Sequence, residues 1–126
     1  MLRTGVDLIE IERLQEVVQR HGQRFLQRVF TARELGEAGQ NLASLAARFA
    51  AKEAVSKALG TGIGTIGWLE IEITHGPVRQ PVLHLNGEAA RLASDLGLRE
   101  WSVSLSHTPA HAIALVVATG GQPDLA

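Results

Sequence analysis

The stretch ARFAAKEAVSKALG, residues 47–60, predicts the helix around which this protein is built. At 100° per residue its small apolar side chains fall on a single stripe, which would face a core. The opposite face carries Phe49, Lys52, Glu53, Ser56 and Lys57. An aromatic ring on a polar face predicts that a bound substrate or a second subunit covers it. Gly60 is suited to end the helix, because glycine adopts the left-handed conformation of a C-cap without strain.

The composition of the whole chain limits what the protein can be. Its 126 residues, 45% of them hydrophobic, are enough for one domain, expected over residues 1–119 with a frayed tail at 120–126. The absence of cysteine excludes disulfides and thiolate chemistry and fits a cytoplasmic location. A net charge of −1 argues against a nucleic-acid partner. The apolar runs are too short for a membrane span, so no membrane association is expected.

Outside the central helix, expected over about 41–59, strands and helices are intermixed. Alternating or apolar runs predict strands at 3–9, 68–74 (with one face in solvent), 82–85, 101–107 and 111–118, the last two as a hairpin. Further helices are predicted at about 10–22, 24–30 and 87–95, and Thr31 with Glu34 has capping-box spacing. Because strands and helices do not strictly alternate, we predict an α+β fold, in which a small antiparallel sheet packs against the long central helix and shorter helices.

Two motifs with familiar chemistry have weak support in this chain. Gly62, Gly64 and Gly67 match the G-x-G-x-x-G spacing of dinucleotide-binding loops. They follow a helix and precede a strand, however, which is the reverse of the order that such a loop requires. We interpret them as a glycine connector whose backbone can approach a ligand closely. His107 and His111 have metal-ligand spacing, but the proline between them favours the flank of a hairpin over a zinc site.

Asp7, Glu53 and Lys57 are the strongest candidates for chemistry. Asp7 interrupts an apolar strand, so it is either a strand-end or capping residue or a functional carboxylate. Glu53 and Lys57 are spaced i, i+4, and as a plain surface pair they would contribute about 0.3–0.5 kcal/mol. Two carboxylates from different elements, with ammonium groups and a glycine-rich backbone nearby, suit Mg²⁺ that holds phosphates.

Several segments carry a family likeness. GVDLIEIERL at 5–14 and RFAAKEAVSKALGTGIG at 48–64 resemble the two signature segments of the 4'-phosphopantetheinyl transferases, in particular their compact class, the holo-[acyl-carrier-protein] synthases. FLQRVFT at 25–31, LHLNGEA at 83–89 and SVSLSHTPAHAIALVVA at 102–118 are similar to other segments of that class. The chain departs from the family at Thr4, where a first glycine is frequent, and in its short segment before the central helix.

The resemblance implies an activity and a role for each matching residue. The family moves the 4'-phosphopantetheine arm of coenzyme A onto a serine of an apo acyl carrier protein and releases adenosine 3',5'-bisphosphate. Asp7 and Glu53 would bind Mg²⁺, and Lys57 would contact phosphates, so these three are the implied catalytic residues. Contacts with coenzyme A, the substrate, are implied for Arg48, Phe49, Lys52, Lys57, Gly60, Thr61, Gly62, His107 and Thr108. The proton acceptor is open between Glu53 and a water molecule on the metal.

The resemblance also implies partners and an assembly. Acyl carrier proteins are acidic around their serine, which gives a predicted docking role to Arg13, Arg20, Arg24 and Arg28. The compact class is trimeric, with active sites between subunits, and it serves fatty acid biosynthesis. The run HAIALVVA at 111–118, apolar on both faces, adds support for a homotrimer in which the carboxylates of one chain face His107 of the next.

Two other kinds of function stay open. One is a non-catalytic module that binds coenzyme A or phosphate with the same helix face. The other is a helical interaction protein that docks acidic partners through its arginines. Dependence on a metal separates an enzyme from simple docking, because a chelator would leave docking unchanged.

Overall fold

The computed structural model describes residues 1–120. In chain order the elements are β1 (Leu2–Glu10), α1 (Ile11–His21), α2 (Gln23–Val29), α3 (Ala32–Ala38), α4 (Leu42–Leu59), the 3₁₀ helix η1 (Trp68–Glu70), β2 (Ile71–His75), β3 (Pro81–Leu85), α5 (Gly87–Asp95), β4 (Glu100–His107) and β5 (His111–Thr119). None of these helices is long and apolar enough to cross a membrane. Of the predicted tail only Gly120 belongs to the described residues, and its N–H donates to the Met1 carbonyl oxygen.

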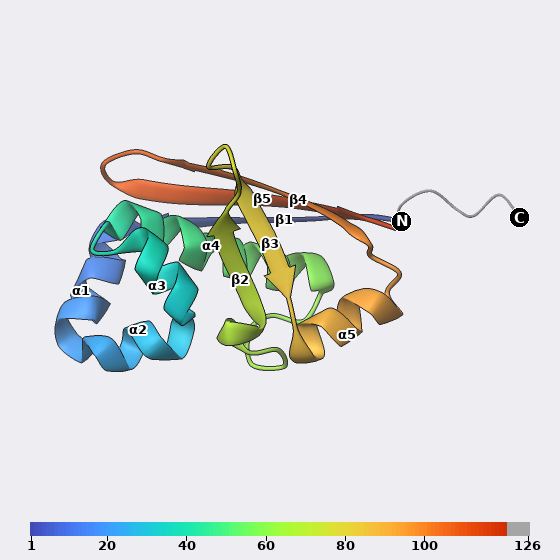
Figure 1. Cartoon of the computed structure of the whole chain (residues 1–126), viewed down its shortest axis with the longest axis horizontal. Coiled ribbons are helices and arrows are strands. Elements are labelled where there is room, and N and C mark those ends of the chain that lie inside the picture. The colour runs from blue at the N-terminus through green and yellow to red at the C-terminus, as the bar shows by residue number, and fades with distance from the viewer. Residues whose placement is uncertain (121–126) are drawn as a thin grey trace, which may run out of the picture.

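The strands form two antiparallel sheets. One has three strands in the order β1-β5-β4, and the other pairs β2 with β3. β1 and β5 pair along their whole length, from Leu2 opposite Thr119 to Glu10 opposite His111. In Figure 1 the three-stranded sheet forms one layer, and the helices all lie on the same side of it. The predicted α+β class is confirmed, although the strands divide into two sheets where we predicted one.

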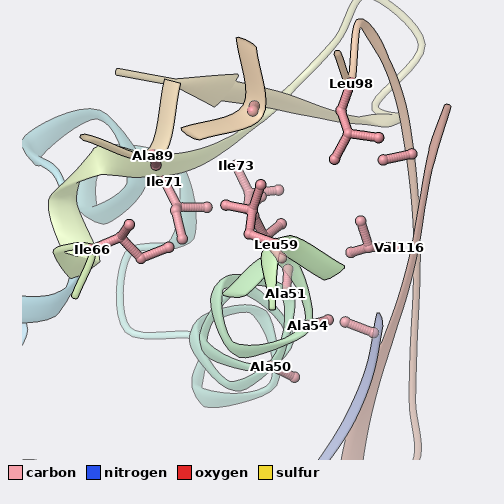
Figure 2. Close-up of a cluster of buried hydrophobic side chains, with 14 residues drawn as sticks. Ala50, Ala51, Ala54, Leu59, Ile66, Ile71, Ile73, Ala89, Leu98 and Val116 are labelled. Atoms are coloured by element: carbon pink, nitrogen blue, oxygen red, sulfur yellow. The ribbon is translucent and has the colours of Figure 1, made fainter. Parts of the chain in front are cut away.

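α4 lies at the centre of the core. Its C-terminal half packs with β2, β5 and α5 in one cluster, and its N-terminal half packs with α1, α2 and α3 in another. Figure 2 shows Ala51 and Ala54 of α4 in the same cluster as Ile71 of β2 and Val116 of β5. The alanines allow close approach, so that Gly5 of β1 rests directly on the helix backbone: a Cβ added there would lie 1.9 Å from the Ala54 carbonyl oxygen.

The helix ends form as the sequence predicts. In the capping box, Glu34 N donates to Thr31 Oγ1 at 3.1 Å and Thr31 N donates to Glu34 Oε1 at 2.9 Å. The long helix is expected to start at about Asn41, and the structure adds that Asn41 caps α4 by accepting from the N–H of Ser44 at 3.0 Å. Gly60 ends the same helix in the left-handed conformation, with φ 81°. These features depend on residues three or four apart, which is why the sequence alone reveals them.

The prediction of a strand over 68–74 is wrong in its first half. Residues Trp68–Glu70 form η1, and β2 begins only at Ile71. The Glu70 N–H donates to the Gly67 carbonyl oxygen at 3.1 Å, and the Glu70 carboxylate accepts from the Gly67 N–H at 2.7 Å, so these residues close a turn on themselves instead of pairing with a strand. The predicted solvated face is present only in part, since Glu72 is half-buried and Thr74 is almost fully buried.

The sheet face turned away from α4 is apolar over β1 and β5, whereas β4 adds the exposed Ser102, Ser104 and Ser106. Its exposed side chains include Val6 and Leu8 of β1 and Ile113 and Leu115 of β5. The alternate residues of β5, such as Val116, are buried against α4. β5 is therefore apolar on both faces, as the sequence predicts, and Figure 1 shows no helix over the outer face.

Candidate active site

β1 and α4 bring together Asp7 and Lys57, which lie 50 residues apart along the chain. Lys57 Nζ lies 3.0 Å from Asp7 Oδ1 and also donates to the Val6 carbonyl oxygen at 2.9 Å. The Lys57 side chain is 52% exposed and that of Asp7 is 20% exposed, so both can meet a ligand. Asp7 caps no helix, because Glu10 is the N-cap residue of α1. Among residues 1–120 no i, i+4 ion pair joins Glu53 to Lys57, since Lys57 reaches across to β1 instead.

Glu53 belongs to the same group of charges. Its burial and, after that, the negative charge of Asp7 raise the pKa of Glu53 above its ordinary value, and the positive charge of Lys57 offsets this only in part. A cation held by Asp7 and Glu53 would relieve the repulsion between them. The donor set fits Mg²⁺, which takes one or two protein carboxylates and completes its coordination with water and substrate oxygens. Across residues 1–120, no three or more His, Asp or Glu side chains are grouped to hold a metal ion.

A cavity of about 420 Å³ opens beside these carboxylates. It is lined by Asp7, Leu8, Ile9, Arg13, Leu14, Val17, Phe25, Phe49 and Glu53. Its lining thus combines two carboxylates, several apolar side chains and the positive charge of Arg13. Such a cavity can hold a polar reacting group and an uncharged chain side by side. We refer to it below as the carboxylate cavity.

Lys52, predicted to contact coenzyme A, is completely buried, and that prediction is wrong. Its Nζ lies 2.8 Å from Glu34 Oε1 and donates to the Trp68 and Ile71 carbonyl groups. Burial lowers the pKa of Lys52, and the negative charge of Glu34 opposes that effect. Of the charged residues predicted on the polar face of this helix, Lys52 is therefore buried, and only Glu53 and Lys57 are accessible at the site.

Glu34 is a residue whose importance the sequence analysis missed. It is completely buried, and besides closing the capping box it pairs with Lys52 of α4. Its Oε2 accepts from the N–H of Ile73 in β2 at 2.9 Å. The carboxylate therefore fixes α3, α4 and β2 relative to one another. The capping-box spacing signals only the local contact, and no sequence pattern signals the other two.

Arg48 and Phe49 are each held by partners within the chain. Arg48 is 2% exposed, and its Nη1 donates to the Ile73 carbonyl oxygen at 2.6 Å and pairs with Glu37 Oε1 at 3.2 Å. Its contact with coenzyme A stays a prediction. The Phe49 ring lies 4.8 Å from that of Trp68 and 6.4 Å from that of Phe25, measured between centroids. The two neighbouring rings cover part of Phe49, and the ring also lines the carboxylate cavity, so its cover by a substrate or a second subunit stays a prediction.

The glycine connector after α4 uses its N–H groups to close the helix. Gly60 N donates to the Lys57 carbonyl oxygen, and the N–H groups of Thr61 and Gly62 both donate to the Ser56 carbonyl oxygen. A ligand contact by Gly60, Thr61 or Gly62 stays a prediction, and in this conformation their N–H groups are already engaged. The helix before the connector is as predicted, and η1 followed by β2 comes after it.

His107 and Thr108 lie on the other side of α4. Arg48 and His107 line a second cavity, of about 260 Å³, which contains neither Asp7 nor Glu53. β5 lies between β4, which His107 ends, and β1, which carries Asp7. The Thr108 hydroxyl accepts from the N–H groups of Ala110 and His111 and so shapes the hairpin turn. One chain therefore does not bring the two halves of the predicted site into a single cavity.

The four predicted docking arginines are exposed on α1 and α2. None of Arg13, Arg20, Arg24 and Arg28 forms an ion pair within residues 1–120. Arg24 and Arg28 flank Phe25 and His21 in a surface hollow, and Arg13 lines the carboxylate cavity. Because Phe25 lines both hollows, Arg24 and Arg28 lie next to the carboxylate cavity.

Comparison with known proteins assigns this arrangement to a family. The model of the 4'-phosphopantetheinyl transferase superfamily matches residues 3–116, a span that includes Asp7, Glu53 and Lys57. The chain belongs to this superfamily. The family resemblance found in the sequence is therefore confirmed.

Relatives and solved structures narrow the class within the superfamily. The holo-[acyl-carrier-protein] synthase of Herpetosiphon aurantiacus is 50% identical, with 95% of this chain and all of that protein covered, and that of Moorella thermoacetica is 48% identical, with 93% of each covered. The crystal structure of the Helicobacter pylori holo-[acyl-carrier-protein] synthase in complex with coenzyme A has a TM-score of 0.85 at 34% identity and covers 92% of this chain and 99% of that one. The predicted enzyme class, a phosphopantetheinyl transferase of the holo-[acyl-carrier-protein] synthase type, is confirmed.

Proposed function

We propose that this phosphopantetheinyl transferase moves the 4'-phosphopantetheine group from coenzyme A to a serine of an apo acyl carrier protein, with Mg²⁺, and releases adenosine 3',5'-bisphosphate. The observation that carries the proposal is the group formed by Asp7, Glu53 and Lys57, which opens into a cavity beside exposed arginines. The coenzyme A complex of the Helicobacter pylori relative supports the choice of donor. Work in fatty acid biosynthesis and a cytoplasmic location stay predictions.

Each residue of the group has a distinct task in the transfer. The serine oxygen of the carrier protein attacks the phosphorus that bears the pantetheine arm, and the bond from that phosphorus to the bridging oxygen breaks. Asp7 and Glu53 would hold Mg²⁺, which when bound withdraws negative charge from phosphate oxygens. Lys57 offers a compact positive charge to the same phosphates, and its contacts with Asp7 and the Val6 carbonyl oxygen hold it in place beforehand. The serine proton passes to Glu53 or to solvent.

The test of this function is a direct transfer assay. The purified chain is incubated with coenzyme A, Mg²⁺ and an apo acyl carrier protein, and the carrier is analysed by mass spectrometry. We expect the carrier to gain the mass of one phosphopantetheine group, and a carrier whose acceptor serine is replaced by alanine to gain none. Binding of coenzyme A without transfer would instead identify a non-catalytic module. If the chain binds the carrier equally well with and without a chelator and transfers nothing to it, the chain is a docking protein.

The exposed arginines predict how the carrier protein docks. Reversing Arg20 or Arg24 to Glu is expected to raise the KM for the carrier about tenfold or more, because a repulsive charge replaces an attractive one at an exposed interface. The KM for coenzyme A should stay the same, and added salt should weaken the wild-type interaction in a similar way. Steady-state kinetics with each substrate varied in turn would measure this. Arg91→Glu, on the exposed face of α5, is the control reversal. Equal effects at Arg91 and at the arginines of α1 and α2 would contradict the assignment.

We propose further that three chains assemble so that each active site lies between two of them. Two observations support this: the two halves of the site line separate cavities, and the outer sheet face is apolar over β1 and β5. Exposed Val6, Leu8, Ile113 and Leu115 form a patch of a kind that soluble monomers seldom leave open to water. A cyclic arrangement would cover this patch and let the carboxylates of one chain face His107 of the next.

Subunit complementation tests the shared site. Glu53→Gln and His107→Ala each disable a different half of the site. The two variants are mixed after reversible dissociation, or expressed together. We expect about a quarter of the wild-type activity or less, because only some of the interfaces between different variants pair two intact halves. Sedimentation velocity should report three chains per particle. Activity that stays at the level of the separate variants at every mixing ratio, or sedimentation as a monomer, would refute the shared site.

A further inference from the structure

Lys57 engages one of the carboxylate oxygens that a metal ion at this site would use. Its Nζ lies 3.0 Å from Asp7 Oδ1 and donates to the Val6 carbonyl oxygen at 2.9 Å, so two contacts hold the ammonium group on β1. The Lys57 side chain is nevertheless 52% exposed, and its flexible stem ends in a group that a ligand can reach. The ammonium group can therefore exchange Asp7 for a stronger partner while α4 and β1 stay in place.

The second carboxylate of the site has no such partner. Glu53 lies one turn before Lys57 on α4, and none of the ion pairs within residues 1–120 includes it. Both Asp7 and Glu53 line the carboxylate cavity. Of these two carboxylates, only that of Asp7 has a cation of the chain bound to it.

An ammonium group and a divalent cation compete for the same carboxylate oxygen. Both are positively charged, and at a separation of a few ångströms their mutual repulsion is strong at a protein surface. Mg²⁺ also gives up its water reluctantly, so a carboxylate that is already paired binds it poorly. A pyrophosphate shifts this balance, because its several anionic oxygens offer the ammonium group more charge-assisted hydrogen bonds than one carboxylate oxygen does.

We propose that Lys57 blocks Asp7 against a metal ion in the free chain and releases it when a phosphate-bearing substrate binds, so that this side chain couples the two binding events. The inference rests on the proposed function. Lys57 would then act before the chemical step as a positioning residue, since it makes the site take up a metal ion together with the donor substrate. Such coupling is reciprocal, so Asp7 also holds Lys57 back from a phosphate as long as no metal is present.

The first experiment measures metal binding without substrate. Mn²⁺ serves as the probe, because it shares the preference of Mg²⁺ for oxygen ligands in octahedral geometry and its free concentration can be followed by electron paramagnetic resonance. Lys57→Met removes the ammonium group and keeps a long side chain that suits a helix. Its Kd for Mn²⁺ is expected to be about tenfold lower than that of the wild type, within the range usual for coupled sites. Arg13→Met, the matched control, removes a positive charge that lines the same cavity and makes no ion pair with Asp7, so its effect should be much smaller.

The second experiment measures substrate binding without metal. Isothermal titration calorimetry with coenzyme A and a chelator compares the wild type with Asp7→Asn and Glu53→Gln. Both variants lose one negative charge of the site, but only Asp7→Asn weakens the contact that holds Lys57. We expect Asp7→Asn to bind coenzyme A about fivefold more tightly than Glu53→Gln does. A general effect of charge would improve both variants equally. This comparison also tests the inference if Lys57→Met does not fold.

The results that overturn this inference differ from those that overturn the proposed function. Equal Kd values for Mn²⁺ in the wild type and Lys57→Met, an equal gain in Arg13→Met, or equal binding of coenzyme A by Asp7→Asn and Glu53→Gln refutes the blocking role of Lys57 alone. A wild-type chain that binds neither Mn²⁺ nor coenzyme A, whether they are added singly or together, refutes the proposed function as well.

Discussion

Replacing Glu53 with Gln is expected to lower turnover about 10³-fold and to leave the folded state at least as stable as that of the wild type. The loss of activity follows because an uncharged amide cannot neutralise a cation at the phosphates, and single groups of this kind contribute about 10²–10³ in rate. Stability should be preserved because the half-buried carboxylate is repelled by Asp7. The transfer assay and thermal denaturation measure the two effects on the same sample.

The metal dependence and the pH dependence of stability provide the accompanying measurements. Mg²⁺ should raise the melting temperature of the wild type, because a ligand that binds only the folded state stabilises it, and this shift should be absent in Glu53→Gln. The pKa of Glu53 in the folded chain lies above its ordinary value of 4.5. Without metal, the stability of the wild type relative to Glu53→Gln should therefore fall as pH rises from the pKa of Glu53 in the unfolded chain to its higher pKa in the folded chain.

Metal reverses the sign of this effect. Because Mg²⁺ binds the ionised carboxylate, the stabilisation that it gives should increase with pH over the same interval and disappear on acidification. Two outcomes would contradict the assignment of Glu53: near-normal turnover of Glu53→Gln at low Mg²⁺, or an equal Mg²⁺ shift of the melting temperature in both proteins.

Gly5→Ala is expected to destabilise the protein by about 3 kcal/mol or more, a large share of the 5–15 kcal/mol that stabilises a typical domain. The added Cβ would lie 1.9 Å from the Ala54 carbonyl oxygen and 2.8 Å from its carbonyl carbon. Both atoms belong to the backbone of α4, so relief requires β1 and the helix to move apart. That movement would also separate Asp7 from Lys57, and activity should fall with stability.

Gly36→Ala is the matched control for this substitution. Gly36 lies within α3, and a Cβ added there would meet no atom within 4 Å. Alanine is favoured over glycine inside a helix, so Gly36→Ala should leave stability unchanged or raise it by about 0.5–1 kcal/mol. Chemical denaturation of both variants makes the comparison, and a Gly5→Ala protein as stable as Gly36→Ala would disprove the close packing of β1 on α4.

The sequence by itself determined the features that depend on near neighbours. Helical spacing over 41–59 and the glycine stop at Gly60 define α4, and the capping box at Thr31 defines the start of α3. The signature segments also indicated the family and its acidic and basic site residues. These signals are readable because side chains three or four apart meet on a helix whatever surrounds it.

Only the tertiary structure decided which of the polar residues could reach a ligand. Lys52 and Lys57 stand five residues apart on α4, yet Lys52 is buried against Glu34 and Lys57 meets Asp7 at the surface. The strand predicted from Trp68 onward is replaced by η1, where the Trp68 carbonyl oxygen accepts from Lys52 and the Glu70 carboxylate accepts from the N–H of Glu88. In each case the deciding partner lies at least 16 residues away along the chain. A periodic pattern records how side chains are spaced on one element and carries no information about what packs against it.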